Sequence, residues 1–264
     1  ILKELKMKKA LIYFTMIVGI TAVIGACKKS GDDSSTTATC AGMPIAEAPT
    51  CSDTASGSIT GLDNSSLSGV YDPYHAFGIS GTAGVDNTTG CISNASLLSI
   101  LGGPTGTASV ITNTAVTSSS SMAARHKYYS DTSCSTEIAS ISFGYTDVTL
   151  ADNVTGLSTS VDGDTYPSTA TQVTYKKSCF IAKGSTAAGV TYINNLFQGG
   201  LSMDVGTEYK CQNSGSTKYN LMKVLDTSAL SVGTDSIWYF DDSSTAYPTD
   251  WTEDASTFLQ LSDL

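Results

Sequence analysis

Positive charge is scarce in this sequence, and Arg125 is the only arginine among its 264 residues. Lysine and arginine together number 14 against 24 aspartates and glutamates, which gives a formal net charge of −10. Binding of a nucleic-acid backbone needs clustered basic side chains that neutralise the phosphates. The composition therefore excludes nucleic acid as a partner.

Histidine is also rare, with only His75 and His126. The chain contains neither the G-x-S-x-G elbow of serine hydrolases nor the H-E-x-x-H helix of zinc proteases. His75 lies in an aromatic run over residues 71–77 that could line a pocket, whereas the charged neighbours of His126 favour a solvated loop or strand end. No pair of cysteines has C-x-x-C spacing. The sequence therefore predicts no enzyme, no metal site and no cofactor.

Long hydrophobic runs are absent after residue 26, but residues 10–26 form one uncharged stretch. Lys8 and Lys9 precede this stretch, and Cys27 follows it directly. A short cationic start, an apolar core and small residues at the cut are the features of an export signal. A single membrane-spanning helix is the alternative, but a run of 17 residues is at the short limit for crossing a bilayer.

The residues at the expected cut, Ile24-Gly25-Ala26-Cys27, resemble the lipobox of bacterial lipoproteins. In that family the cysteine receives a diacylglycerol, the peptide is cut before it, and the new amino terminus is usually acylated. The resemblance implies that Cys27 is lipidated and begins the mature protein. Two or three acyl chains anchor a protein stably, so the membrane is the first expected partner.

The residues after Cys27 indicate where the protein is held. No aspartate follows the cysteine directly, and in the enteric sorting rule that this pattern resembles, such an aspartate retains lipoproteins in the inner membrane. Its absence favours the outer membrane of the cell envelope. Residues 30–39 are small, hydroxylated and acidic, which predicts a disordered tether. We expect upstream residues and a signal peptide over 1–26, a lipidated end and tether over 27–59, and a single β domain over 60–264.

Six cysteines remain when Cys27 is set aside. An even number in an oxidising compartment predicts three disulfides, which agrees with export. Closeness in sequence and the strand pattern favour the pairs Cys40–Cys51, Cys91–Cys134 and Cys179–Cys211.

From about residue 60 onward, short β-like runs alternate with turn clusters. Ile141, Phe143 and Tyr145 are spaced two residues apart, as in a half-buried strand. Aspartate pairs at 162/164 and 241/242 are flanked by glycine or serine and predict turns rather than calcium or glycosidase sites. Helical patterns are short, over 94–101 and 119–125. The whole predicts an all-β fold, either an antiparallel up-and-down barrel or a β-sandwich, with short helices.

Three short segments resemble uncharacterised lipocalin-like exported β proteins. They are Leu-Ser-Gly-Val-Tyr at 67–71, Tyr-Tyr-Ser-Asp-Thr-Ser-Cys at 128–134 and Leu-Ser-Val-Gly at 230–233. The resemblance implies a barrel with an apolar mouth that holds a small ligand, and it implies no catalytic residues.

Strand alternation gives the candidate ligand pocket, because residues two apart share one face. Phe143, Tyr145, Tyr219 and Trp238 are the candidates for lining an apolar interior, with Ile141 and Leu221 beside them. Filling of an ordinary core by the aromatic side chains is the alternative. The residues expected to point outward are Ser142, Gly144 and Asn220.

Two functions follow from these expectations. The first is an envelope lipoprotein that carries a small apolar or amphipathic ligand. The second is a structural or protein-interaction module of the cell envelope without an internal ligand, whose protein partner the sequence does not identify.

Overall fold

The computed structural model describes residues 39–40, 43–44, 51–72, 83–84, 86, 89–161, 163–196, 203–212, 216–226, 236–243, 245–252 and 255–261. Cys27 with its predicted export signal, residues 30–38 of the predicted tether over 30–39, and His75 lie outside the described residues. Within the described part, no helix has both the length and the apolar character needed to span a membrane.

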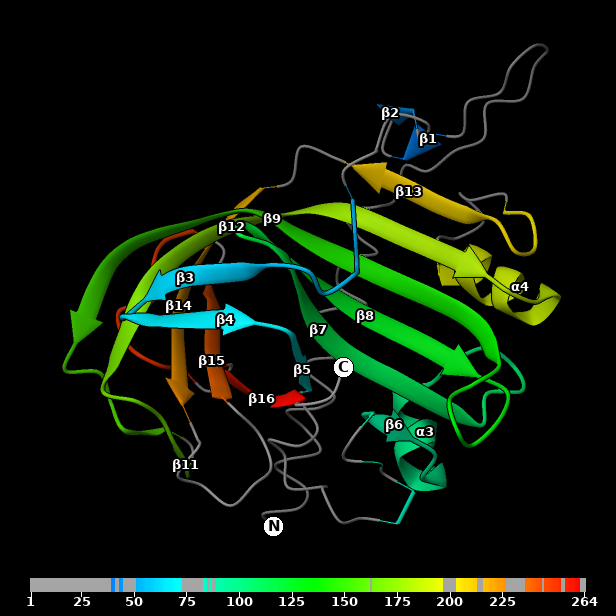
Figure 1. The fold of residues 1–264 in the computed structure, drawn as a ribbon, viewed down its shortest axis with the longest axis horizontal. Coiled ribbons are helices and arrows are strands. Elements are labelled where there is room, and N and C mark those ends of the chain that lie inside the picture. The colour runs from blue at the N-terminus through cyan, green and yellow to red at the C-terminus, as the bar shows by residue number, and fades with distance from the viewer. Residues whose placement is uncertain are drawn as a thin grey trace.

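Eight antiparallel strands pair in chain order, and the last of them pairs with the first. Figure 1 shows the result as a strongly curled sheet, which confirms the all-β prediction and favours its barrel alternative. The strands, in order around the ring, are β5 (Val70–Asp72), β7 (Ser109–Ser118), β8 (Ser121–Tyr129), β9 (Glu137–Thr155), β12 (Thr169–Gly184), β14 (Thr217–Asp226), β15 (Ser236–Ser243) and β16 (Ser256–Leu261).

The long strand β12 pairs with β9 along one edge and with two shorter strands along the other edge. Its first half pairs with β14, and its second half pairs with β13 (Glu208–Gln212), which is the last strand on that side of the sheet. A strand of two residues, β6 (Cys91–Ile92), pairs with the first part of β7. The ring is therefore closed at one end of β12 and splayed at the other.

A hairpin of β3 (Ser58–Leu62) and β4 (Ser65–Ser68) covers the closed end. It contacts both β7 and β14, which lie on opposite sides of the ring. Lys223 of β14 forms an ion pair with Asp63 in the hairpin turn, and Leu62 and Leu67 are fully buried beneath it. Two further hairpins join β1 (Thr39–Cys40) to β2 (Met43–Pro44) and β10 (Ser160–Val161) to β11 (Asp164–Thr165).

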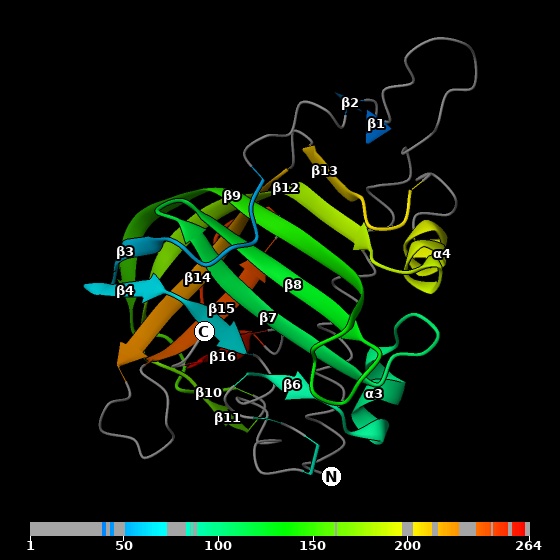
Figure 2. The same cartoon turned by 45° about the vertical axis from the view of Figure 1, so that its right-hand side comes forward.

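Packed side chains occupy the space that the sheet and the β3–β4 hairpin enclose. Tyr71, Tyr175 and Phe258 are at most 1% exposed and belong to one hydrophobic cluster with Met122 and Met222. A second cluster continues along the same face toward the splayed end, where α3 (Ala95–Leu101) and α4 (Ala187–Leu196) complete it. Figure 2 shows both helices at that end of the sheet.

The helix predictions were half right. Helix α3 confirms the helical pattern over 94–101, and the Asn94 side chain caps it by accepting hydrogen bonds from the backbone amides of Ser96 and Leu97. The prediction over 119–125 was wrong, because these residues form the β7–β8 turn and the start of β8. Helix α4 was not predicted.

Of the two turns predicted at aspartate pairs, one is found in the structure and the other is replaced by a strand. Gly163 lies in the turn between β10 and β11 as expected, whereas Asp164 begins β11 and Asp162 lies outside the described residues. Asp241 and Asp242 lie within β15 instead of a turn, opposite Leu221 and Asn220. Asp241 is 1% exposed and accepts hydrogen bonds from the backbone amide and hydroxyl of Thr252. A buried carboxylate with two donors can be tolerated inside a strand, which the local sequence did not reveal.

Helix α4 lies very close to strand β9 at Gly189. A Cβ atom on Gly189 would lie 2.1 Å from the carbonyl oxygen of Ile138, so only glycine allows this approach.

Gly189→Ala is expected to lower the free energy of unfolding by about 2 kcal/mol, because the helix must move away from the sheet and loosen its buried contacts. Chemical denaturation measures the change. Asn195→Ala, at an exposed position of the same helix, is the control and should stay within about 0.5 kcal/mol of the wild type. Equal effects of the two substitutions would contradict the close packing of α4 on β9.

Candidate functional site

Two of the four predicted pocket residues point into the barrel. Phe143 packs against Phe180 with ring centroids 5.5 Å apart, and the Tyr145 ring meets Tyr175 edge to face at 5.0 Å. Both residues belong to or pack against the hydrophobic clusters that fill the interior. The neighbouring Ser142 takes the outward position, as expected.

The prediction for β14 was wrong by one register position. Asn220 lies opposite Val173, and Met222 lies opposite Thr171, so Asn220 shares the inner face. Leu221 lies on the outer face, where it packs in a separate cluster. Tyr219, on that same outer face, meets the ring of Tyr247 at 5.1 Å.

The reason is that β14 is covered on both faces. The rings of Trp251 and Tyr166 stack on each other, with centroids 5.6 Å apart, and both pack with Leu221 on the outer face of the strand. A buried leucine there therefore does not mark the barrel interior. The fourth candidate, Trp238, lies in β15 opposite Val224 and Phe258, and its side chain lies outside the described residues.

His126 was expected at a solvated position, but its side chain is buried on the inner face of the barrel. It lies between Thr112 of β7 and Ile141 of β9, on the inner face, and is 7% exposed. Its Nε2 atom has no hydrogen-bond partner among the described residues, and burial lowers its pKa to about 4. Strand alternation explains the error, because the charged neighbours Arg125 and Lys127 take the outward positions.

The disulfide predictions were partly right. Cys91–Cys134 is confirmed, with Cα atoms 6.0 Å apart. The pairs Cys40–Cys51 and Cys179–Cys211 were wrong, because Cys51 is bonded to Cys179, with Cα atoms 5.6 Å apart. Cys179 lies opposite Gln212 and not opposite Cys211, so the two cysteines on β12 and β13 are not a cross-strand pair.

Residues 51–57 cross the outer face of the sheet, and we call them the strap. They were expected to belong to the tether, but they pack as part of the domain. The Cys51–Cys179 disulfide holds one end of the strap, and the backbone amides of Ser56 and Gly57 donate to the Val116 carbonyl at the other. Ordered structure therefore begins before the predicted boundary at residue 60.

The only arginine of the chain lies under the strap. Arg125 donates to the Asn113 side chain at 2.7 Å and to the Asp53 carbonyl at 3.1 Å. The Asp53 carboxylate accepts from the Ser142 hydroxyl at 2.8 Å, so strap and sheet are joined by polar contacts along its length. Burial lowers the pKa of Arg125, with the Asp53 carboxylate opposing that effect.

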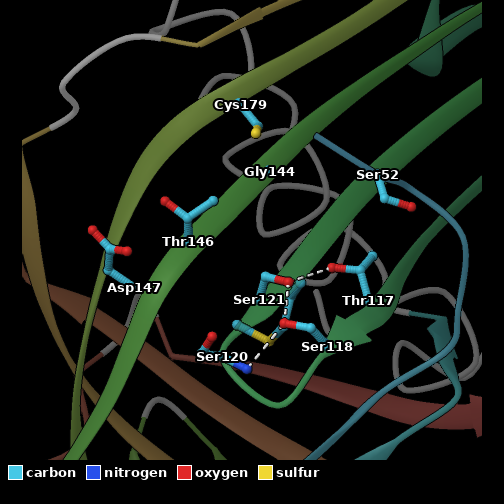
Figure 3. A pocket seen from close by; sticks show the side chains of 10 residues that line it. Ser52, Thr117, Ser118, Ser120, Ser121, Gly144, Thr146, Asp147 and Cys179 are labelled. Atoms are coloured by element: carbon cyan, nitrogen blue, oxygen red, sulfur yellow. Dashed lines mark hydrogen bonds between the residues drawn. The ribbon is translucent and has the colours of Figure 1, made fainter. Parts of the chain in front are cut away.

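A pocket of about 360 Å³ opens on the outer face between the strap and the β7–β8 turn. Figure 3 shows side chains from the strap, from the turn and from β9 around it. The disulfide forms part of its wall, since Cys179 lines the pocket and lies opposite Gly144. The lining residues are Ser52, Thr117, Ser118, Ser120, Ser121, Met122, Gly144, Thr146, Asp147 and Cys179.

Glycine at position 144 is needed for this wall. A Cβ atom there would lie 2.4 Å from the Cβ of Cys179, so a larger residue would displace the bridge.

The pocket is rich in hydroxyl groups. Six serines and threonines line it, and the Ser121 hydroxyl is hydrogen-bonded to those of Thr117 at 2.7 Å and Ser118 at 2.6 Å (Figure 3). Asp147 supplies the one carboxylate of the lining and forms an ion pair with Lys176 at 3.0 Å. Such a surface can donate and accept several hydrogen bonds at once.

Sequence reasoning missed this site. Residues 117–121 read Thr-Ser-Ser-Ser-Ser, and the last three of them fall in the predicted helical pattern over 119–125. The run of hydroxyls was a usable signal for a polar turn. Nothing local indicated that the strap and the irregular part of β9 around Asp147, whose φ is 56°, would surround that turn.

The chain matches no model of a known protein family, and no curated protein is similar enough to count as a relative. No activity or partner is therefore inherited from another protein.

Proposed function

We propose that this protein is a lipid-anchored, non-enzymatic binding module of the bacterial cell envelope, and that its outer-face pocket takes a small polyhydroxylated ligand such as a saccharide unit. The observation that carries the proposal is the lining of the pocket, with six hydroxyl groups and one carboxylate. Its volume of about 360 Å³ falls in the range of small-molecule sites.

The packing of the interior supports a surface site over an internal carrier site. An apolar ligand inside the barrel would need the space that Tyr71, Tyr175 and Phe258 fill, and these side chains are at most 1% exposed. The β3–β4 hairpin and the two helices lie over the ends of the sheet. Of the two functions expected from the sequence, a module without an internal ligand fits this packing better.

Binding also fits the pocket better than catalysis. A serine nucleophile needs a base within hydrogen-bond reach, and histidine is the commonest one. The residues that line the pocket include no histidine, and their one carboxylate, Asp147, is engaged by Lys176.

Titration of the domain with glucose, N-acetylglucosamine and their disaccharides, followed by calorimetry, tests the proposed site. We expect saturable binding of at least one sugar, weakened about tenfold or more by Asp147→Asn, because a hydrogen bond to a charged group contributes about 1.5–3 kcal/mol. Asparagine also tolerates the left-handed backbone at this position. Asp152→Asn, at an exposed position of the same strand, is the matched control and should bind as the wild type does.

The rival carrier function is tested in parallel with an environment-sensitive fluorescent fatty acid. Saturable binding of that probe, with no sugar binding, would contradict the proposed sugar site and favour a carrier function with the ligand inside the barrel. Equal binding by the Asp147→Asn and Asp152→Asn variants would place the sugar site elsewhere on the molecule.

The proposed anchor is tested by Cys27→Ser. Acyl transfer and signal cleavage both depend on that thiol, so the variant should remain uncleaved and incorporate no label from an acyl analogue. The wild type should be labelled and recovered with the membranes. Equal labelling of the two proteins would rule out Cys27 as the acceptor.

A further inference from the structure

We infer that Cys40 and Cys211 form a third disulfide, which fastens the β1–β2 hairpin to the edge strand β13. This inference rests on the proposed export of the protein to the cell envelope and does not depend on the proposed ligand.

The two observed disulfides leave few choices for the remaining thiols. Cys51–Cys179 and Cys91–Cys134 use four of the six cysteines that follow Cys27. Cys40 and Cys211 are the two that remain. In an oxidising compartment a pair of neighbouring thiols is converted to a disulfide, so their separation in the fold decides the outcome.

The fold brings the two cysteines to neighbouring elements. Cys40 is the last residue of β1, and Cys211 lies in β13, opposite Phe180 of β12. Strands β1 and β2 both contact β13, and Figures 1 and 2 show the hairpin beside that strand in both views. A disulfide requires Cα atoms about 4.4–6.8 Å apart, a separation that contacting strands provide.

The position of β13 gives the bridge a physical role. This strand is the last on its side of the sheet, where exposed backbone groups of an edge strand can pair with another chain. A covalently held hairpin beside β13 would hinder such pairing. It would also fasten the chain to β13 at Cys40, in addition to the observed attachment to the neighbouring strand β12 at Cys51.

Formation of the bridge is a two-electron oxidation. The two thiols lose two protons and two electrons as the sulfur–sulfur bond forms. A protein disulfide of an envelope thiol oxidoreductase accepts them by exchange and leaves as the dithiol.

The bridge is tested on the full mature chain, purified with detergent from the membranes of an oxidising host. The protein is denatured without reductant, treated with N-ethylmaleimide and digested. Trypsin alone leaves Cys40 and Cys51 in one peptide, because no lysine or arginine lies between residues 29 and 125. A second protease that cuts after Glu47 separates them. Mass spectrometry then identifies the linked and the alkylated peptides.

We expect a peptide that joins Cys40 to Cys211 and no maleimide on any of the six cysteines. Cys40→Ser should place maleimide on Cys211 alone. As a control for the method, Cys91→Ser should place it on Cys134 alone. Maleimide on both Cys40 and Cys211 in the wild type, or a peptide that joins Cys40 to Cys27, would overturn the inference.

Discussion

The double variant Cys51→Ala/Cys179→Ala is expected to lose about 5 kcal/mol of the free energy of unfolding. The disulfide joins residues separated by 128 positions, and the loop-entropy relation gives about that value for so long a loop. Cys51 and Cys179 are 2% and 8% exposed, so alanine leaves no buried polar group behind. Urea denaturation under non-reducing conditions measures the change.

A local measurement separates loss of the strap from loss of the whole fold. The amides of Ser56 and Gly57 donate to the Val116 carbonyl at 3.1 and 3.2 Å, and hydrogen exchange at these two amides reports directly on the strap. Both should exchange much faster in the variant, while the β9–β12 ladder stays protected. The pocket should lose its sugar binding in the same variant, because the strap and the bridge form part of its wall.

Cys91→Ala/Cys134→Ala is the matched control. It removes a bridge of separation 43 that does not touch the strap, and the same relation gives about 4 kcal/mol. The amides of Ser56 and Gly57 should remain protected in the folded control. Protected strap amides in both double variants would contradict the assignment of Cys51–Cys179 as the attachment of the strap.

The free energy of unfolding is expected to fall by about 3 kcal/mol between pH 6.5 and pH 4 through His126 alone. The pKa of this residue is about 4 in the folded protein, below the ordinary value of 6.5 that applies when the chain is unfolded. Between these two values the unfolded chain binds more protons than the folded one, so acid favours unfolding. The stabilisation is complete above about pH 6.5 and is lost as the pH falls toward 4.

Urea denaturation at a series of pH values tests this, with His126→Gln as the variant that cannot titrate. Carboxylates titrate in the same range, so the informative quantity is the stability difference between wild type and variant. That difference should change by about 3 kcal/mol across the range. His75→Gln measures how much of the pH dependence comes from the other histidine of the chain. A difference that does not change with pH would show that the buried imidazole does not titrate as its position requires.

Local sequence patterns predicted where strands occur better than they predicted which side chains of a strand point into the barrel. The spacing of Ile141, Phe143 and Tyr145 correctly indicated a strand with an inward face, because the residues between them, Ser142 and Gly144, are small and not hydrophobic even though the strap covers them. The same reasoning failed at Leu221. The outer face of β14 is itself buried beneath Trp251 and Tyr166, so hydrophobicity no longer distinguishes inside from outside.

The disulfide predictions succeeded or failed according to how far apart the paired cysteines lie in the sequence. Cys91 in β6 and Cys134 in the connection between β8 and β9 both lie beside β7, and closeness along the chain was a sufficient guide. Cys51 meets Cys179 only because the strap runs across four strands, from β12 over β9 and β8 to β7, and closeness along the chain says nothing about such a crossing.

The amino-acid sequence by itself determined the all-β class, the order of many strands and turns, and the capped helix at Asn94, because these depend on residues a few positions apart. Only the tertiary structure decided that His126 is buried, that Asn220 and not Leu221 faces the interior, and that a strap, a serine-rich turn and an irregular strand together form a polar pocket. Each of these features joins residues from separate strands and loops, and their contacts exist only after the sheet has curled and paired its first strand with its last.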